Sequence, residues 1–506
     1  MSRRRLYSIG VGNRGLVSGR PGAWIMALWA LSLIGLSGCD TSLPRNGFTD
    51  FFVKDYSLPA YDPATENLGE SRRELAPEEA TGGMGGVLGA AAGGQLRAWQ
   101  ASASGGVGGV GGMVLGQLYV ETERREPLPE AYPTLVLALP IVATDPNKGP
   151  TFGLLPPVIM KEQDRLTNIL APDLVYNEID GYGGNFRMRR FFSYDSWLVL
   201  DAGATSEGAH EYDFHYAQRR LGPRSNGFFR GRLYYLTSLA NRFFGIGNET
   251  EDDAESSYVF RRGEATATLG LELPFKFSLE LQERLTSYKV GPGRLDDVAS
   301  TRARFPGVPG VRDPRLQILT HKITLSWDTR DSPTAPSEGI FAQGSVEISD
   351  DALGSDIGYQ RYSFAVVGLY PKLDRRLISV LRVAGWVLKG DEVPFYELTS
   401  VGGKFTHRGY GDGRFVDTNG FVASFEERWN AITYELMDVK QIIQFAGFVD
   451  LGRVYGEDES FTLKDLHVAV GGAVRLVVPE SELVTSIDMG ISDEGMAVFV
   501  GLDYPF

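Results

Sequence analysis

Apolar and polar residues alternate with a period of two along most of the chain after residue 134. In the final stretch, 496–506, every second side chain is apolar and the chain ends on the aromatic ring of Phe506. The same alternation recurs at 266–273, 340–349, 468–478 and 486–491. A period of two places successive side chains on opposite faces of a strand. The pattern predicts an all-β chain whose strands each have one apolar and one polar face.

Two architectures use such strands. In a sandwich the apolar faces of two sheets pack on each other, whereas in a membrane barrel they face lipid and the polar faces line a hydrated lumen. Three residues of the terminal strand, Gly501, Tyr504 and Phe506, resemble the C-terminal signal that recruits outer-membrane barrels for insertion. This feature favours the barrel, and the start of the chain bears on the same choice.

Residues 1–38 resemble a secretory signal that ends at a lipoprotein cleavage site. Five arginines and no acidic residue accompany an apolar run at 23–36, and this run is too short for a comfortable transmembrane helix. An L-S-G-C sequence ends at Cys39, the only cysteine of the chain, so we expect lipidation there. A stray cysteine beside an ordinary signal is the alternative. Asp40 conflicts with this picture, because in some bacteria that residue retains lipoproteins at the inner membrane.

A secretory start together with an aromatic C-terminus favours the membrane barrel over the sandwich. The expected location is the bacterial outer membrane. About sixteen candidate strands fit between residues 150 and 506, at roughly 9–11 residues for each crossing, and bacterial single-chain barrels have even strand numbers. We therefore predict a transmembrane antiparallel β-barrel of about sixteen strands, which forms the domain 134–506.

Two further segments separate the signal from the predicted barrel. Residues 39–80 are polar and contain several prolines, as expected of an extended tether carrying the lipid. Residues 81–133 begin with a glycine-rich, almost uncharged stretch. Such a composition is typical of a flexible linker, but glycines also allow close backbone packing, so a segment that plugs the lumen or packs on the membrane is the alternative.

Charge and motif content exclude several functions. Removing the signal leaves 45 basic against 64 acidic residues, a net charge of −19, which argues against a nucleic-acid partner. The five histidines lack metal-ligand spacing, and neither G-x-S-x-G nor a phosphate-binding loop occurs. We therefore expect no catalytic residues, no metal and no cofactor, and interpret the chain as a membrane protein rather than an enzyme.

Several motifs carry a resemblance to a known family. A W-D-T-R-D-S-P sequence contains Asp328, Arg330 and Asp331 and is followed by Gly339, which resembles the signature of the BamA/TamA-type bacterial surface antigen family. Further family-like segments follow in the expected order, at 401–403, 408–410, 414–415, 423–426 and 448–455, and a similar one precedes them at 242–248. The resemblance covers 240–506. It implies an outer-membrane barrel with one loop folded into the lumen.

The resemblance also assigns roles to individual residues. Arg408, Gly409 and Tyr410 match the R-G-[FY] tip of the family's inward-folded loop. By alternation, Glu426 and Asp450 lie on the polar faces of the two strands after that loop. The resemblance implies that these two carboxylates hold Arg408, because the fixed fork of donors on a guanidinium engages two acceptors at once. The alternative is three ordinary lumen-facing charges in water.

Family members that assemble barrels or secrete proteins carry periplasmic POTRA repeats. No POTRA pattern is recognisable in residues 40–133, which makes this chain resemble a POTRA-less member with a lipoprotein-type signal. This departure weakens the inference of an insertase role, because substrate handover in the family depends on those repeats. Three functions remain: insertion or translocation of proteins or lipids, a passive pore or structural barrel, and, least favoured, a partner of a lipolytic enzyme. Outer-membrane lipids and the barrel-assembly machinery are the expected partners, with an unknown cargo.

Overall fold

The structure of the protein is a computed structural model, which describes residues 134–136, 139–156, 158–162, 165–193, 195–312, 315–332, 335–436, 439–478, 483–502 and 504–506. All of these residues belong to one compact unit, Gly35–Phe506. The predicted segments 1–38, 39–80 and 81–133 lie outside the described residues.

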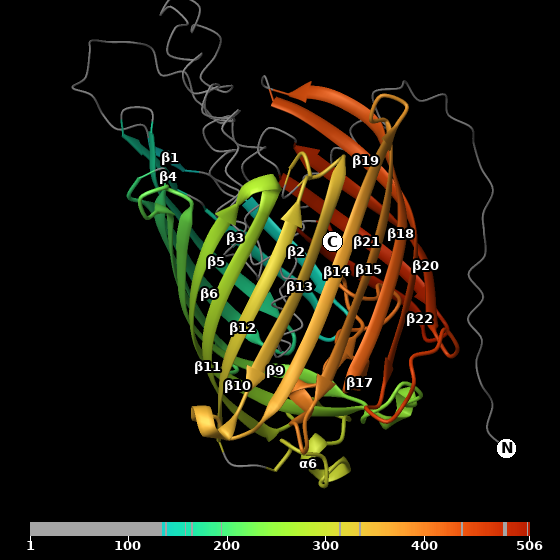
Figure 1. Ribbon diagram of the computed structural model, residues 1–506. Helices are drawn as coiled ribbons and strands as arrows, with labels where there is room; N and C mark the ends of the chain where they lie inside the picture. The colour runs from blue at the N-terminus through green and yellow to red at the C-terminus, as the bar shows by residue number, and fades with distance from the viewer. Residues whose placement is uncertain are drawn as a thin grey trace, which may run out of the picture. The chain divides into compact units, whose positions relative to one another are not determined.

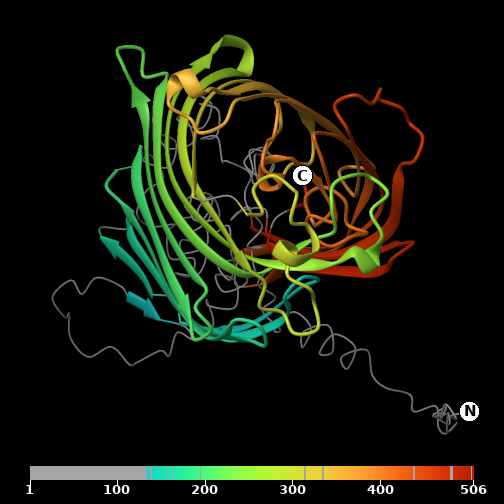
Figure 2. The ribbon, with the colours of Figure 1, turned by 90° about the horizontal axis from the view of Figure 1, so that it is seen from below.

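Twenty strands form one antiparallel sheet, which curves round to enclose a lumen (Figures 1 and 2). The strands before the inward loop are β1 (Thr134–Val136), β2 (Leu139–Asp145), β3 (Gly149–Leu155), β4 (Val158–Glu162), β5 (Arg165–Asn177), β6 (Gly181–Phe191), β7 (Ser196–Thr205), β8 (His210–Leu221), β9 (Gly227–Phe243), β10 (Ser256–Leu273), β11 (Phe277–Pro292), β12 (Leu316–Asp328), β13 (Gly339–Ser349), β14 (Tyr359–Lys372) and β15 (Leu377–Lys389). Those after it are β18 (Asn419–Leu436), β19 (Val439–Tyr455), β20 (His467–Val478), β21 (Leu483–Ser492) and β22 (Gly495–Leu502). A separate two-stranded sheet pairs β16 (Thr399–Val401) with β17 (Phe415–Asp417).

From β5 onward the pairing follows the chain. Each strand from β5 to β15 is laddered to the next, β15 pairs with β18, and the sequence continues to β22. That run contains sixteen strands. At the N-terminal edge, β3 and β4 both pair with β5 in the same register, so they act as one interrupted strand. Beyond them, β2 pairs with β3 and β1 pairs with β4. The prediction of a large antiparallel barrel is confirmed.

The two edges of the sheet meet where β2 lies beside β22. Every other neighbouring pair around the barrel is joined by a ladder, but none is found between the described residues of these two strands. Because ladder hydrogen bonds are what hold strands in register, the β2/β22 junction is the part of the wall with the fewest backbone constraints.

Side chains alternate between the two faces of the wall as the sequence pattern predicts. On β10 and β11 the outward residues are apolar and exposed, for example Leu269 (59%) and Leu281 (51%), while their sequence neighbours Thr268 and Glu280 are buried on the lumen side. Where β11 begins and β12 ends, the rings of Phe277 and Trp327 stack on the outer face of the wall, with their centroids 6.2 Å apart. Aromatic rings that border an apolar band mark the membrane interface of a barrel.

The two ends of the barrel differ. Tight turns join strands at one end, among them the β10–β11 turn with η3 (Pro274–Lys276), whereas longer loops at the other carry the short helices η2 (Asp252–Ala254), α6 (Thr301–Arg304), η4 (Asp351–Leu353) and η5 (Phe395–Glu397) (Figure 1). Short periplasmic turns and long extracellular loops are typical of outer-membrane barrels. The α6 end therefore corresponds to the outside of the cell. Within the described ranges, helices are too short or too polar to cross a bilayer.

Candidate functional site

The connection from β15 to β18, residues 390–418, folds back into the lumen. It runs through η5 and then forms the β16–β17 hairpin, where Thr399 is opposite Asp417. Gly402 and Gly403 follow β16 with φ of 129° and 91°, in the left-handed region that favours glycine. These two residues turn the chain so that the R-G-Y sequence at 408–410 forms the innermost part of the loop.

Arg408 at this tip is almost completely enclosed by carboxylates. Its Nε and Nη2 donate to Asp450 Oδ2 and Oδ1, both at 2.8 Å, which is a bidentate ion pair. Its Nη1 donates to Glu426 at 2.5 Å and to Asp488 at 3.3 Å. The Arg408 backbone N–H adds a fifth contact, to Asp450 at 3.1 Å. The structure therefore places Arg408 between the two carboxylates that the resemblance implied, and adds a third.

The carboxylates are themselves shared with other lumen arginines. Arg475 pairs with Glu426 at 2.6 Å and with Asp488 at 2.8 Å, and Arg428 pairs with Glu426 at 2.7 Å. All of these side chains are 1% exposed or less. A buried charge is tolerated when it is paired and hydrogen-bonded. The loop tip is therefore one member of an interlocked network whose other members stand on the barrel wall.

Small residues on the wall make room for the tip. The guanidinium carbon of Arg408 lies 3.4 Å above the ring of Phe448, a stacking contact that adds to the ion pairs. A Cβ on Gly490 would lie 2.1 Å from the Arg408 carbonyl oxygen, and a Cβ on Gly409 would lie 2.4 Å from the Ala469 methyl group. Glycine at both positions is required for so close an approach of loop and wall.

The rest of the tip contacts the hairpin between β21 and β22. The Tyr410 hydroxyl donates to Asp493, and the Arg414 guanidinium pairs with Glu494 at 2.6 Å. The Ser492 hydroxyl donates to the Gly409 carbonyl at 2.9 Å. The tip is therefore attached to the last two strands of the barrel as well as to β18 and β19.

The beginning of the same loop is attached to the opposite wall. Glu397 of η5 is fully buried and accepts hydrogen bonds from Tyr288 of β11 and, at 3.2 Å, from Tyr359 of β14; Arg361 pairs with it at 3.3 Å. Phe395 packs on the aromatic rings of the same wall, which belong to β9 and β10. The loop therefore spans the lumen near its extracellular end, as the view along the barrel shows (Figure 2).

Electrostatics favour the charged form of the tip arginine. Burial alone would lower the pKa of Arg408, but the adjacent carboxylates of Asp450, Glu426 and Asp488 outweigh it and raise the pKa above its usual value. The neighbouring His407 is also buried, and this burial lowers its pKa from 6.5. Its Nε2 lies 3.0 Å from the His467 carbonyl oxygen. His407 is therefore a neutral packing residue near pH 7, and Arg408 supplies the positive charge within the R-G-Y sequence.

The C-terminal residues depart from the predicted strand. The sequence pattern placed Tyr504 and Phe506 on the outward apolar face, but β22 ends at Leu502, and both rings are buried, with Phe506 inside the lumen. Tyr504 lies 3.7 Å from the guanidinium carbon of Arg428, and Phe506 packs on Val380 of β15. That expectation was wrong because the alternation in the sequence continues to residue 506, whereas the β21–β22 ladder ends at the pair of Thr485 and Leu502.

A physical reason for the turn inward lies in the final residues. Pro505 has no N–H to donate to a ladder, and the rings of Tyr504 and Phe506 contact arginines in the lumen. Phe506 lies 5.4 Å from the guanidinium carbons of both Arg382 and Arg408. A role of Gly501, Tyr504 and Phe506 in membrane insertion stays a prediction, since it concerns the unfolded precursor rather than this folded arrangement.

The W-D-T-R-D motif forms the β12–β13 turn at the periplasmic end. Arg330 makes a bidentate ion pair with Asp328, with contacts of 2.9 Å and 2.7 Å. Asp331 accepts hydrogen bonds from the backbone N–H groups of Ser337 and Glu338, at 2.8 Å and 3.1 Å. These residues lie far from the Arg408 network along the strands. Their contacts indicate that the motif organises a turn rather than a ligand site.

Gly339 closes this turn and yields a testable prediction. Its φ is 109°, and an added Cβ would lie 2.6 Å from the Thr329 carbonyl oxygen. We expect Gly339→Ala to destabilise the folded barrel by about 1–3 kcal/mol in denaturant unfolding, from backbone strain plus this clash. Gly495→Ala is the matched control, because Gly495 has φ of 114° but open space around it. Equal destabilisation of the two variants would contradict the packing explanation.

The remaining predicted site residue, Cys39, lies outside the described residues, and its lipidation stays a prediction. Within the lumen, sequence reasoning gave no role at the loop tip to Asp488, Arg475 or Arg428, although alternation places Arg475 on the inward face. Alternation alone places Asp488 on the polar face of its strand, and that signal was available. The height at which Asp488 meets Arg408 depends on the β19–β20–β21 registers, which pair Asp450 with Ala469 and Ala473 with Asp488.

Comparison with known proteins gives three kinds of result. The family model of the Omp85 superfamily domain matches residues 183–487, more than half of the chain. None of the curated proteins matches. Among solved structures, BamA from Haemophilus ducreyi lacking POTRA domains 1–3 is similar with 16% identity and a TM-score of 0.47, covering 72% of this chain and 74% of that one. CdiB from Escherichia coli has 12% identity and a TM-score of 0.42, with 75% and 63% covered. CdiB from Acinetobacter baumannii has 12% identity and a TM-score of 0.37, with 74% and 65% covered.

Proposed function

This chain belongs to the Omp85 superfamily and is an outer-membrane β-barrel, and we propose that it inserts or translocates proteins, or lipids, at the outer membrane. A barrel can release cargo sideways into the bilayer only where two strands separate. The observation that carries the proposal is the junction of β2 and β22, the one pair of neighbouring strands around the described wall without a ladder. Separation at any other position would break a continuous set of backbone hydrogen bonds.

The inward loop supports a transporter over a passive pore. It is attached to β11 and β14 through Glu397 and to β18, β19 and β21 through Arg408. A permanently open pore gains nothing from a segment tied across its lumen. A translocation barrel, by contrast, needs a barrier that keeps solutes from leaking while cargo is handled. The loop meets that need.

A disulfide lock tests the proposal. One cysteine on β2 and one on β22, oxidised in the membrane, should abolish the activity, whereas a pair at Met489 and Val498, which are already opposite each other in the β21–β22 ladder, should leave it unchanged. The readout is the abundance of other outer-membrane barrels and the distribution of outer-leaflet lipids in cells. The lock should reproduce the defect of depletion, and a reductant should reverse it.

Three results would overturn the proposal. Depletion without any change in other barrels or in lipid distribution would remove the assembly and translocation roles together. A locked β2/β22 junction with full activity would show that no cargo passes between these strands. A steady ionic current through the purified protein would favour the passive pore as the function instead.

A further inference from the structure

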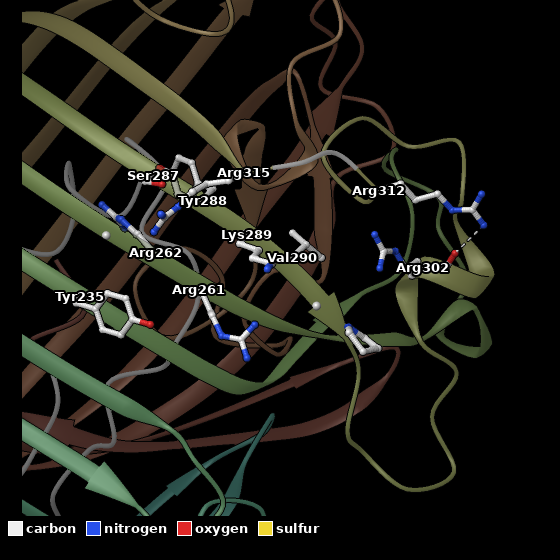
Figure 3. Close-up of a pocket in the computed structure, with 13 residues that line it drawn as sticks. Tyr235, Arg261, Arg262, Ser287, Tyr288, Lys289, Val290, Arg302, Arg312 and Arg315 are labelled. Atoms are coloured by element: carbon white, nitrogen blue, oxygen red, sulfur yellow. Dashed lines mark hydrogen bonds between the residues drawn. The ribbon is translucent and has the colours of Figure 1, made fainter.

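A cationic cavity opens on the outer side of the barrel wall near its extracellular end. It has a volume of about 920 Å³ and lies against β9, β10 and β11 and the loop that carries α6 (Figure 3). The residues that line it are Tyr235, Arg261, Arg262, Gly263, Ser287, Tyr288, Lys289, Val290, Gly291, Pro292, Arg302, Arg312 and Arg315. Its size suits a ligand of some tens of atoms.

All of the charged residues that line the cavity are cationic. Six of its residues are Arg or Lys and none is Asp or Glu, in a chain whose net charge is −14. Arg262 belongs to the lumen, where it is fully buried and paired with Glu264. Within the described ranges, no ion pair joins the other five to a carboxylate, although Arg312 donates to the Arg302 carbonyl at 3.4 Å. Among the described residues, no carboxylate therefore neutralises these five cations through an ion pair.

Alternation places the key cations on the membrane side of the wall. Arg261 and Lys289 are opposite each other in the β10–β11 ladder and share the outward face with Leu269 and Leu281 lower down. Lys289 lies twelve residues beyond Phe277, whose ring stacks outward near the periplasmic end. At about 3.3 Å per residue and a tilt near 40°, this is roughly 30 Å of height, the thickness of the hydrocarbon core.

Neighbouring aromatic rings support the same placement. Tyr235 faces outward on β9 opposite Gly263 and stacks on Tyr212 of β8, with ring centroids 6.1 Å apart. Tyrosine is enriched at the level of lipid headgroups. Arg261 and Lys289 lie beyond Tyr235 along their strands, and Arg315 directly precedes β12 at the level of Lys289, since Tyr288 is opposite Leu316. Arg302 of α6 lies farther along, in the extracellular loop (Figure 3). The cations are thus at the headgroup level of the outer leaflet, directly over an apolar wall.

We propose that this cavity binds the phosphorylated headgroup of an outer-leaflet glycolipid. Guanidinium and ammonium groups pair with phosphate through charge-assisted hydrogen bonds, and the outward apolar side chains of β10 and β11 take up the acyl chains. Gly263 leaves the wall open at the cavity, since a Cβ there would have no neighbour closer than 3.9 Å. A free anion would pair only with the cations of the cavity. A phosphorylated lipid would pair with the cations and also cover the apolar side chains of β10 and β11.

The test uses the full chain in detergent micelles and three probes: bisphosphorylated lipid A, the same lipid with its phosphates removed, and inorganic pyrophosphate. Native mass spectrometry measures how much of each is retained. Wild type should retain bisphosphorylated lipid A at least about tenfold better than the dephosphorylated lipid or pyrophosphate. The double variant Arg261→Gln, Lys289→Gln should lose most of that preference. This site is independent of the proposed transport function.

A matched control uses two cations at the opposite end of the barrel. Arg224 and Lys276 are exposed in the β8–β9 and β10–β11 turns, and neither forms an ion pair among the described residues. Arg224→Gln, Lys276→Gln should bind like wild type, and heat-modified gel mobility shows that both double variants are folded. Undiminished lipid A binding by Arg261→Gln, Lys289→Gln would overturn the proposal. Pyrophosphate binding as tight as that of lipid A would overturn it too, because the site would then be one for a free anion.

Discussion

Replacing Arg408 with alanine is expected to destabilise the barrel by about 3–5 kcal/mol, the range for removing one partner of a buried ion pair. Three buried carboxylates, Asp450, Glu426 and Asp488, lose the cation they share at the loop tip. Arg475 and Arg428 still neutralise Glu426, but Asp450 keeps no other ion pair among the described residues. The unpaired Asp450 therefore accounts for most of the expected loss.

This explanation is tested by a double-mutant cycle. Denaturant unfolding of the protein folded in micelles gives the free energy for wild type, Arg408→Ala, Asp450→Asn and the double variant. Asp450→Asn in the Arg408→Ala background should restore part of the lost stability, because it removes the stranded charge. Arg408→Lys should be intermediate, since an ammonium cannot form the bidentate pair. The loop is not held by this pair if the two single losses of unfolding free energy simply add up in the double variant, or if Arg408→Ala is as stable as wild type.

Replacing Phe506 with alanine is the second change with a large expected effect, a loss of about 3–5 kcal/mol. The ring packs on Val367, Leu369, Ile378 and Val380 inside the barrel. The guanidinium carbons of Arg382, Arg408 and Arg428 also lie within 5.8 Å of its ring centroid, an arrangement that adds favourable cation–π energy when water is excluded. Removing the ring leaves a cavity beside the Arg408 network.

The measurement must separate stability from biogenesis, because the same residue is predicted to signal membrane insertion. Refolding of urea-denatured protein into micelles requires no assembly machinery, so any loss there belongs to the folded state. Phe506→Leu retains much of the apolar packing but not the aromatic face, and should fall between wild type and Phe506→Ala. Full stability of Phe506→Ala in micelles, with reduced abundance in cells, would mean that the ring serves insertion only.

The orientation of the site residues followed from the sequence. Period-two alternation placed Glu426 and Asp450 on the polar faces of their strands, and both are buried on the lumen side. Their convergence on Arg408 did not follow from alternation, because a strand pattern gives no information on how a loop returns across a barrel. The family resemblance supplied that part, through the R-G-Y sequence at 408–410.

Contacts that depend on registers between strands were not predictable. Asp488 reaches Arg408 only because two successive ladders set its height, and a shift by two residues in either ladder keeps every side chain on its own face while moving Asp488 away. The same limit applies to Glu397, whose partners Tyr288 and Tyr359 lie on strands far from it in sequence. The alternation in the sequence shows on which face of a strand a side chain lies, but not its position along the barrel axis.

The end of the terminal strand shows another limit of pattern reasoning. Alternation continues through Tyr504 and Phe506, so the sequence predicts strand as far as the last residue. The structure ends β22 at Leu502, and the ring of Phe506 packs inside the barrel instead of continuing the strand. A cation-rich lumen is visible in the composition of the polar faces, but its ability to attract the tail is a tertiary effect.

The central claim is a membrane barrel whose lumen is crossed by a loop tied to both walls. Ionic conductance of the purified protein in a planar lipid bilayer tests this claim most directly. Wild type should show no large steady current, while a variant lacking residues 402–414, shown to be folded by its heat-modified mobility, should conduct. A large, steady current through the wild-type protein would contradict the account.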